Sequence, residues 1–440
     1  MNSRLFARRR ETFLQLIDPD GVVILPGNQL VARNLDTPYP FRQYSDFYYL
    51  TGYEEPGAIA VMVPGSQRYR FVLFVHRPTE REILYDGRTS DRQFIQQHYG
   101  ASRVYFTEQF EAVIQRIVRR DRPIYYPYGW QPQWDAVIQK LFLSRRSGGL
   151  WPLIDPLPII HRMRRIKHGT DLQAGLLQAV AITSEGLQAG IRSVQPGRWE
   201  YQVQATIEAT FLNQGAQRLA FQSIIASGPN SGILHYVRNN RQMQAGEVVL
   251  MDCGAEYQYY CGDLTRTVPV NGTFSRAQRE IYTLVLHALK TGITACRPGT
   301  TRKEVTRQMD AVLQEGLQRL GLIERPGDFK HYTIHGYIHW LGMDVHDVGG
   351  YTHEGEDIPF EPGMVMTVEP GIYIREDVLS RLQKARVPQD QLERIAKKIQ
   401  KYLNIGIRIE DNIVITEKGN QVLSANLPRE IEDIEAIMKR

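Results

Sequence analysis

Short apolar runs alternate with segments of helical periodicity along the N-terminal part of the chain. The apolar runs predict strands, and apolar residues that recur every three to four positions predict helices. Strands are expected at residues 21–25, 58–63, 71–75, 103–106 and 123–126, and helices at 4–17, 107–118 and 131–143. Alternation of this kind is typical of an α/β domain. We find no phosphate-binding loop and no nucleophile elbow in it, so this part is interpreted as a scaffold.

A Pro-rich run at residues 151–158 predicts a linker, and we place the domain boundary after residue 160. The expected domains are therefore residues 1–160 and 161–440. Within the first domain, residues 36–56 mix aromatic and polar side chains without a clean period. Such a stretch predicts either a binding lip or, more commonly, a packed aromatic loop.

Two helices separated by Pro-Gly are predicted twice in the second domain, around residues 196–197 and 298–299. The apolar positions of the second helix in each pair also correspond: Val203, Ile207 and Phe211 with Val305, Met309 and Leu313. In each half, an apolar run ends at a carboxylate followed by x-Gly, at Asp252 and at Glu369. Pro-Gly after a helix is common, but the two features together favour a duplicated unit. Two related halves that face each other would bring their carboxylates to one shared site.

The stretch Met251–Thr267 contains two carboxylates, Asp252 and Asp263, in a polar and aromatic segment. A hairpin folded midway between them, after Tyr257, would set the two side chains directly opposite each other, with Cβ atoms about 4.5–5.5 Å apart. Two bare carboxylates at that distance repel each other. The spacing therefore indicates either a solvated surface hairpin or two acids that share a cation.

A further carboxylate, Glu410, lies in a strand pattern at residues 405–416. Isoleucines occupy one face of this predicted strand, and Arg408, Glu410 and Asn412 occupy the other. Five of the eleven histidines lie between residues 331 and 353, where several glycines make a long helix unfavourable. A single histidine of this group would be interpreted as structural, whereas the cluster indicates a site.

The candidate residues are Asp252, Asp263, Glu369, Glu410 and one of the clustered histidines. Four carboxylates converge only if their charge is neutralised, and two divalent cations do this well. An oxygen-rich set with one imidazole suits Mn, Co or Fe better than a thiolate-type zinc site. Two such ions indicate a hydrolase. A magnesium phosphatase could use similar acids, but we find no phosphate-binding loops or Arg pairs in the sequence.

Composition narrows the class of protein. The chain has 440 residues, of which 42% are apolar and 23% charged, as in soluble proteins with two domains. Its net charge of +5 is not clustered, so nucleic acid is not expected as a partner. Three cysteines without a disulfide or zinc pattern indicate a reducing compartment, the cytoplasm. No apolar run approaches the roughly 20 residues that span a membrane.

The order D-x10-D, HGYIHWLG, TVEPG and GIRIED resembles the M24 metallopeptidases, and within them the aminopeptidase P branch. The resemblance extends over nearly the whole chain, through YPFRQYSDFYYLTGYEEP, SGPNSGILHY and LSANLPREIEDIEAIM. It implies an α+β protein in which an N-terminal, creatinase-like α/β domain precedes a pseudo-symmetric "pita-bread" metallopeptidase domain.

The resemblance also implies roles for single residues. Asp252 would bind one of two metal ions with both oxygens, Asp263 and Glu410 would bridge the ions, and His339 and Glu369 would complete the second ion. Glu369 would exchange protons with a metal-bridging hydroxide. The implied catalytic histidines are His235 and His346, and the implied substrate-site residues are His335, Tyr373 and Arg408. The ions are expected to be Mn, with Co, Fe or Zn possible.

The implied reaction is removal of the first residue from peptides with proline in the second position. A prolidase of the same fold, which cleaves Xaa-Pro dipeptides, is the alternative; a module without activity and a metal-free, creatinase-like hydrolase would not need all five ligands. The family further implies a homo-oligomer, a dimer or tetramer, in which the N-terminal domain contributes to assembly and substrate access. A charged, helix-like insertion at residues 375–402 departs from the family pattern and predicts a surface helix, a lid or an oligomer contact.

Overall fold

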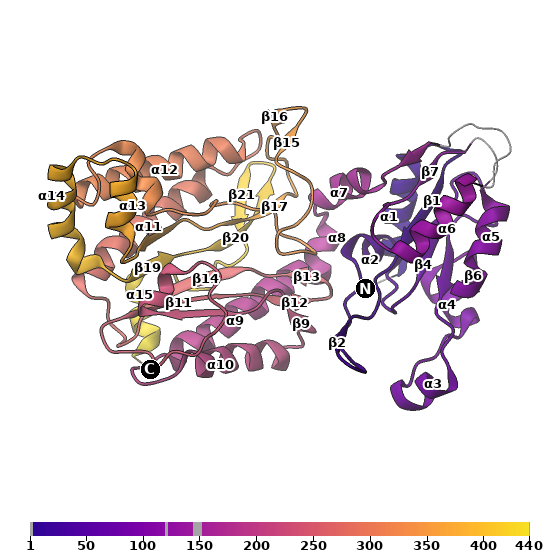
Figure 1. The fold of residues 1–440 in the computed structure, drawn as a ribbon, viewed down its shortest axis with the longest axis horizontal. Helices are drawn as coiled ribbons and strands as arrows, with labels where there is room; N and C mark the ends of the chain where they lie inside the picture. The colour runs from indigo at the N-terminus through magenta and orange to yellow at the C-terminus, as the bar shows by residue number, and fades with distance from the viewer. Residues whose placement is uncertain (1–2, 119–121, 144–151, 440) are drawn as a thin grey trace. The chain divides into compact units, whose positions relative to one another are not determined.

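The computed structural model describes residues 3–118, 122–143 and 152–439. The chain divides into two compact units, residues 1–163 and residues 164–440 (Figure 1). Within the described residues, no helix is both long enough and apolar enough to cross a membrane.

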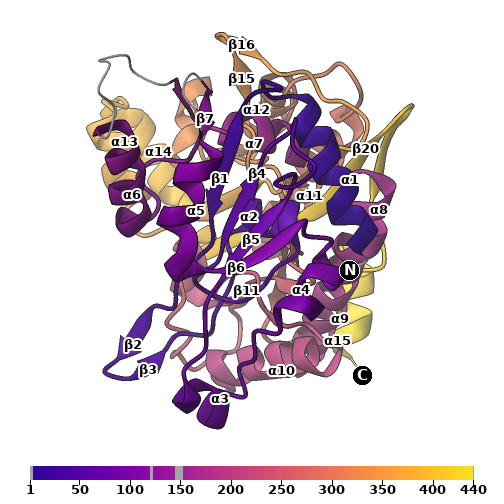
Figure 2. The same cartoon turned by 90° about the vertical axis from the view of Figure 1, so that its right-hand side faces the viewer.

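A six-stranded mixed sheet forms the centre of the first unit. Its strands lie in the order β6-β5-β4-β1-β7-β8, and Figure 2 looks onto the part formed by β6, β5, β4 and β1. The strands are β1 (Val22–Pro26), β4 (Ile59–Met62), β5 (Val72–Val75), β6 (Arg103–Phe106), β7 (Ile124–Tyr125) and β8 (Leu153–Ile154). The helices include α1 (Ser3–Gln15), α5 (Phe110–Ile117) and α6 (Pro132–Leu143). The central strands are buried because elements cover both faces of the sheet. The predicted α/β domain is thus confirmed.

The segment interpreted as a linker belongs instead to the first unit. Strand β8 pairs in parallel with β7 and completes the sheet, and helix α7 (Leu157–Arg165) follows it. The prediction of a linker was therefore wrong over residues 153–158, because Pro residues at the edge of a sheet are compatible with short strands. Residue 151, where the predicted linker begins, lies outside the described residues.

The aromatic stretch at residues 36–56 divides into two parts. Helix α2 (Ser45–Thr51) is buried along its whole length, and Tyr53 is buried beside it, so this part is a packed segment. In contrast, the hairpin of β2 (Ala32–Asn34) and β3 (Thr37–Pro38) is exposed throughout.

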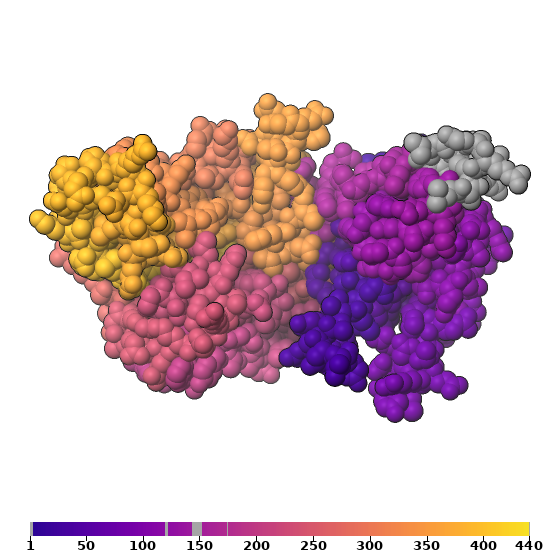
Figure 3. Space-filling model, viewed as in Figure 1, coloured from indigo at the N-terminus to yellow at the C-terminus, as the bar shows by residue number. Residues whose placement is uncertain are grey.

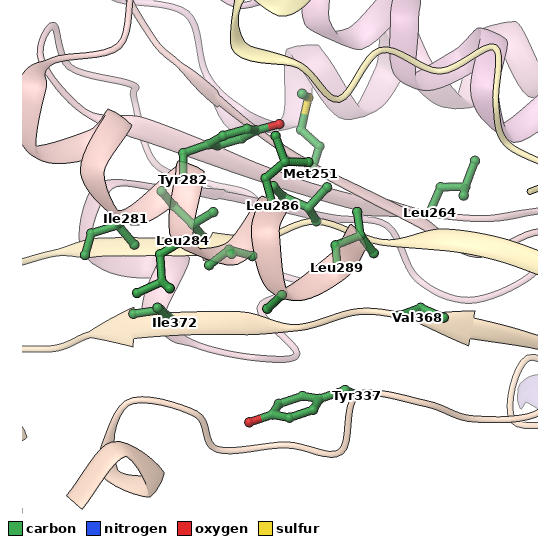
Figure 4. Close-up of a cluster of buried hydrophobic side chains, with 14 of the residues drawn as sticks. Met251, Leu264, Ile281, Tyr282, Leu284, Leu286, Leu289, Tyr337, Val368 and Ile372 are labelled. Carbon is green, nitrogen blue, oxygen red and sulfur yellow. The ribbon is translucent and has the colours of Figure 1, made fainter. Parts of the chain in front are cut away.

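The second unit contains the repeat predicted from the sequence. Helices α9 (Leu177–Ser193) and α10 (Glu200–Asn213) accompany the sheet β10-β11-β14, and helices α11 (Arg276–Ala295) and α12 (Arg302–Arg319) accompany the sheet β17-β20-β21. The strands are β10 (Ile224–Ser227), β11 (Val248–Cys253), β14 (Leu264–Pro269), β17 (Val365–Val368), β20 (Asp411–Thr416) and β21 (Gly419–Val422). The six corresponding apolar positions of α10 and α12 are all fully buried in one core. Figure 4 shows side chains of both halves in that core, including Met251 and Leu264 from one and Val368 from the other.

The register of the first hairpin differs from the prediction. Asp252 pairs with Thr265 and Cys253 with Leu264, and the turn lies at Gln258 and Tyr259, both with positive φ (47° and 68°). Two such residues form the type of turn that matches the twist of a hairpin. Asp252 and Asp263 are therefore diagonal neighbours and not directly opposite. Because side chains alternate with a period of two, a displacement of two residues keeps both carboxylates on the same face.

The predicted strand at residues 405–416 is two strands in different sheets. Strand β19 (Ile405–Arg408) pairs with β18 (Gly371–Ile374), whereas β20 pairs with β17 and β21. Glu410 lies at the break between β19 and β20. The face that carries Arg408, Glu410 and Asn412 is buried like the isoleucine face, with exposures of at most 4%. These polar residues therefore face the interior of the protein and need partners there.

Candidate metal centre

Three of the predicted ligands form a compact cluster. One ligand atom from each of Asp263, His339 and Glu410 lies within 4.8 Å of the others. His339 Nε2 is 3.3 Å from Asp263 Oδ2 and also 3.3 Å from Glu369 Oε1, so Glu369 joins the same group. Asp252 stands diagonally across the hairpin from Asp263, on the same face. All five residues are thus brought to one place in the second unit.

Each carboxylate stands at or next to the end of a strand. Asp252 lies near the end of β11, Asp263 directly before β14, Glu369 directly after β17 and Glu410 directly before β20. Strands β17 and β20 are antiparallel, with Val368 opposite Asp411, so Glu369 and Glu410 leave the ladder at the same end. The duplicated sheets therefore position the acids, as expected for two related halves that face a shared site.

His339 lies on an extended segment that pairs with β17, not on a helix. The N–H of Thr367 donates to His339 O (2.9 Å), and Trp340 forms an antiparallel bridge with Met366. The N–H of Glu369 donates to Tyr337 O (2.9 Å) in the same register. The backbone of β17 consequently fixes His339 and Glu369 relative to each other.

Hydrogen bonds between the two sheets hold the remaining ligands. The side-chain amide of Asn412 accepts from Asp263 N–H (3.2 Å) and donates to Asp263 O (2.5 Å). The N–H of Glu410 donates to Thr265 O, and the Thr265 hydroxyl donates to Glu410 Oε2 (2.8 Å). Thr265 was not predicted from the sequence, although it follows Asp263 by two residues and strand alternation places it on the same face.

Burial of the acids dominates the electrostatics of the cluster. Desolvation raises the pKa of Asp263 to about 6 and that of Glu369 to about 7, and the neighbouring carboxylates add to this. The pKa of Glu410 is raised well above its ordinary value for the same two reasons. Burial lowers the pKa of His339, but the hydrogen bond and charge of Asp263 outweigh it and raise that pKa to about 9. The acids therefore lack the positive charge that would let them all ionise at neutral pH.

Two buried oxygen atoms show that the residues fit metal ions. Among the side chains that the structure describes, Asp252 Oδ1 and Glu410 Oε1 are buried without a hydrogen-bond partner. A buried carboxylate oxygen without a partner is costly unless a cation binds it. Divalent cations that prefer oxygen and one imidazole nitrogen match this donor set.

A chain of hydrogen bonds runs from Asp252 to the predicted substrate-site residues. Arg408 is buried and donates from Nη2 to Asp252 Oδ2 (2.5 Å) and from Nη1 to the Tyr373 hydroxyl (2.8 Å). That hydroxyl lies 2.8 Å from His335 Nε2, and His335 Nδ1 lies 2.8 Å from Gly336 O. Burial, with Arg408 next in size, lowers the pKa of His335 to about 3, so its imidazole is neutral. His335 therefore donates to Gly336 O and accepts from Tyr373.

The remaining two histidines adjoin the cluster from other segments. The ring of His346 contacts that of His339 edge to face, with centroids 4.4 Å apart. Burial lowers the pKa of His346, and the charges of His339 and His235 lower it further. His235 is exposed, on the loop after the short helix η3 (Gly228–Gly232), and its charge also acts on His335.

The fold and this centre together define a metallopeptidase. The model of metallopeptidase family M24 matches residues 174–417, and that of the aminopeptidase P N-terminal domain matches residues 6–125. The Xaa-Pro aminopeptidase of Escherichia coli strain K12 is 35% identical over 447 aligned positions, which cover 98% of this chain and 97% of that protein.

Solved structures agree with this assignment. The Pseudomonas aeruginosa aminopeptidase PepP superposes with a TM-score of 0.91 at 33% identity, covering 100% of this chain and 98% of that one. A zinc-substituted E. coli aminopeptidase P in complex with product gives a TM-score of 0.90 at 34% identity, with the same coverage. The chain belongs to metallopeptidase family M24 and carries the N-terminal domain of the aminopeptidase P group.

We expect Glu410→Ala to lower metal affinity by more than about 100-fold and to abolish turnover, because the centre loses one of its carboxylate ligands. The secondary structure should persist, because the Glu410 backbone keeps its bond to Thr265. His346→Ala is the matched comparison: it should reduce the rate with much smaller loss of metal. Metal content by mass spectrometry, circular dichroism and peptide turnover are the measurements. Near wild-type activity of Glu410→Ala would contradict the metal assignment.

We expect the metal-free protein to lose thermal stability as the pH rises from 6.5 to 8. The folded-state pKa of Glu369 is about 7 and that of His339 about 9, above their ordinary values of 4.5 and 6.5. The folded protein therefore holds more protons than the unfolded chain in this window, and stability falls with pH. His335, whose pKa is lowered to about 3, opposes this trend only below pH 6.5.

Thermal unfolding of EDTA-treated protein at several pH values, with and without MnCl2, tests this expectation. Bound metal should remove the trend, because it stabilises the ionised carboxylates. A melting temperature of the metal-free protein that rises across the window would show that other groups control its pH dependence.

Proposed function

We propose that this protein is an Xaa-Pro aminopeptidase, which removes the N-terminal residue from peptides with proline in the second position. The observation that carries the proposal is the buried group of four carboxylates and one imidazole on the M24 fold, with two carboxylate oxygens left for cations. Full-length similarity to Xaa-Pro aminopeptidases supports this activity over that of a prolidase.

We propose that the centre holds two divalent ions, Mn in the cell. Asp252 would bind one ion, Asp263 and Glu410 would bridge the pair, and His339 and Glu369 would bind the other. Such ions polarise a carbonyl group and lower the pKa of water, which supplies a nucleophile at neutral pH. Four acids and one imidazole leave a small net charge around two divalent ions, so the donor set supports this number.

Glu369 is the proposed proton carrier of the reaction. Its carboxyl group lies beside the other acids and beside His335, within reach of a water molecule at the centre, and such a group can exchange protons in the reaction. Glu369 would take a proton from the attacking water and give it to the departing proline nitrogen. His335 Nδ1 lies 3.5 Å from Glu369 Oε2, so a neutral His335 borders the place where that nitrogen leaves.

The bond before proline suits a site that recognises the carbonyl group. An Xaa-Pro bond is a tertiary amide without an N–H. Proteases that bind their substrate through the N–H of the cleaved bond therefore recognise it poorly. His235 and His346 are the proposed donors that stabilise charge on the carbonyl oxygen as it develops. Arg408 and Tyr373 would keep Asp252 and His335 in place through their hydrogen bonds.

Two surfaces of the first unit support assembly into a homo-oligomer. Helix α3 (Glu80–Asp86) has no buried residue, and Leu84 and Tyr85 are 80% and 75% exposed. In the hairpin β2–β3, Leu35 is 99% exposed, with φ at 38°. Apolar side chains on projecting segments are typical of protein contacts. We propose that the first domain, expected at residues 1–160, forms the oligomer contact and controls substrate access.

Peptide cleavage tests the proposed reaction. With added Mn, Arg-Pro-Pro should be converted to Arg and Pro-Pro much faster than Gly-Pro is hydrolysed, because an aminopeptidase site accepts residues after proline. Mass spectrometry of the products, repeated with Co and Zn, identifies the bond, the length preference and the metal together. Turnover of the dipeptide alone would assign the prolidase activity instead.

Light scattering with size-exclusion chromatography tests the assembly. The wild-type protein should elute as a dimer or tetramer, and Leu84→Glu combined with Leu35→Glu should shift it to the monomer, because charges at a contact repel and resist burial. Leu212→Glu, at a 66% exposed position of α10 in the second unit, is the matched control and should not change the mass. A monomeric wild-type protein would contradict the proposal.

A further inference from the structure

The insertion at residues 375–402 connects two strands that are direct neighbours. Ile374 of β18 pairs with Ile405 of β19, and the N–H of Asn404 donates to Ile374 O (2.8 Å). A two-residue turn would be enough to join these strands. The chain instead forms helix α13 (Val378–Lys384), helix α14 (Gln389–Ile399) and the turn η5 (Gln400–Tyr402), which Figure 3 shows at the surface of the second unit. We call residues 375–402 the helical insert.

The helical insert is packed into the core of the second unit. Its apolar residues Val378, Leu382, Ile395 and Ile399 are fully buried in the same core as the helix pairs. The predicted surface helix is thus correct for only one face of the insert. A segment held by several buried aliphatic side chains is not a mobile lid, because its opening would expose all of them to water.

The insert is joined by hydrogen bonds to the segment that leads to His335. Arg325, at the start of helix η4 (Pro326–His331), donates from Nε and Nη2 to both carboxylate oxygens of Asp328 (2.9 and 2.7 Å). The same guanidinium donates to Ala385 O (3.2 Å) and to Arg386 O (3.3 Å), directly after α13. The carbonyl groups at the end of a helix carry partial negative charge and favour a cation.

A second ion pair joins the two segments farther along the insert. Arg394 of α14 binds Glu324 with two hydrogen bonds (2.7 and 2.8 Å). Both side chains are partly exposed, so this pair contributes less than the buried contacts. Together with Arg325 it fixes residues 324–328 to the insert at two points.

From η4, a short path of hydrogen bonds reaches the substrate-site residues. The N–H of Tyr373 donates to Tyr332 O (2.9 Å), and the Tyr373 hydroxyl contacts His335 Nε2 (2.8 Å). Tyr373 lies in β18, two residues before the insert begins. Residues 324–335, β18 and the insert therefore form a closed ring of contacts, and His335 is part of this ring.

The insert also touches the segment that leads to His235. Arg375 Nη1 donates to Gly232 O (3.2 Å), at the end of η3. A Cβ atom on Gly232 would lie 2.8 Å from Arg375 Cγ, so the side chain of Arg375 lies directly on this glycine. The insert thus contacts the segment that leads to the partly buried His335 and the segment that leads to the exposed His235, and none of these hydrogen bonds of the insert involves a proposed metal ligand.

We propose that the helical insert is a positioning element that holds residues 324–335 and 228–235 against the metal centre, and thereby sets the placement of His335 and His235. This inference rests on the proposed function for its kinetic consequence. Arg325 acts through the backbone of η4 and is a positioning residue. A shift of about 1 Å in a substrate-positioning group can cost about 100-fold in rate.

The test compares the wild type with Arg325→Ala, with Arg325→Lys and with a variant in which residues 375–404 are replaced by Asn-Gly. Lys397→Ala, at an exposed position of α14, is the matched control. Hydrogen exchange of the amides of residues 327–336 is measured first, because it does not depend on activity. Metal content and the kcat and KM for Arg-Pro-Pro follow.

In Arg325→Ala, exchange of these amides should accelerate and kcat/KM should fall about tenfold, with metal content unchanged. Arg325→Lys should show smaller changes in exchange and in kcat/KM, the replacement variant should show larger ones, and Lys397→Ala should match the wild type.

If the replacement variant does not fold, the two Arg325 variants decide. Unchanged exchange in Arg325→Ala, or activity lost only in proportion to metal, would overturn the proposal. If the wild type were inactive but exchange were faster in Arg325→Ala, the proposed function would be rejected and the positioning role of the helical insert would be retained.

Discussion

The mutual repulsion of buried carboxylates is the constraint on which the second unit depends. Asp252, Asp263 and Glu369 lie close enough to Glu410 to raise its pKa, and burial removes the water that would otherwise separate the charges of the four acids. Without cations, such acids can be buried together only if some of them stay protonated, because each ionised acid would need a partner. His339 and Arg408 supply part of the positive charge, and divalent ions are suited to supply the rest.

The backbone meets this constraint by placing every acid where a strand begins or ends. Backbone hydrogen bonds of the sheets hold these strands in place, while the carboxylate at the end of each strand can point toward the centre. Asn412 and Thr265 then tie the ends together across the two sheets, through hydrogen bonds to Asp263 and Glu410. A rigid scaffold of this kind keeps the ligands in place before a metal ion arrives, which lowers the cost of binding it.

Around this rigid centre, histidines come from segments with less regular structure. His335 and His339 lie on one extended stretch, but β17 fixes His339 whereas Tyr373 holds His335. His235 stands on an exposed loop. If the proposed roles hold, these two kinds of support would separate metal binding from substrate handling. The helical insert contacts η3 and the start of η4, which belong to the segments that lead to His235 and His335.

The sequence by itself determined the elements and the chemistry of the candidates. Periodicity predicted β1, β4, β5, β6 and β7 and helices α1, α5 and α6 of the first unit. The corresponding positions of Val203 and Val305 predicted the repeat, because apolar side chains must share one core. Asp252 and Glu369 were chosen because they end apolar runs, Asp263 because of its spacing from Asp252, and Glu410 because it lies on the polar face of a predicted strand. Tertiary structure decided what depends on contacts between distant residues. The turn at Gln258 and Tyr259 moved the register by two residues, and β19 and β20 joined different sheets, because pairing partners and backbone dihedral angles are not encoded in local periodicity. The role of Thr265, the attachment of the insert through Arg325 and the two carboxylate oxygens without partners likewise became visible only when segments far apart in the chain were folded together.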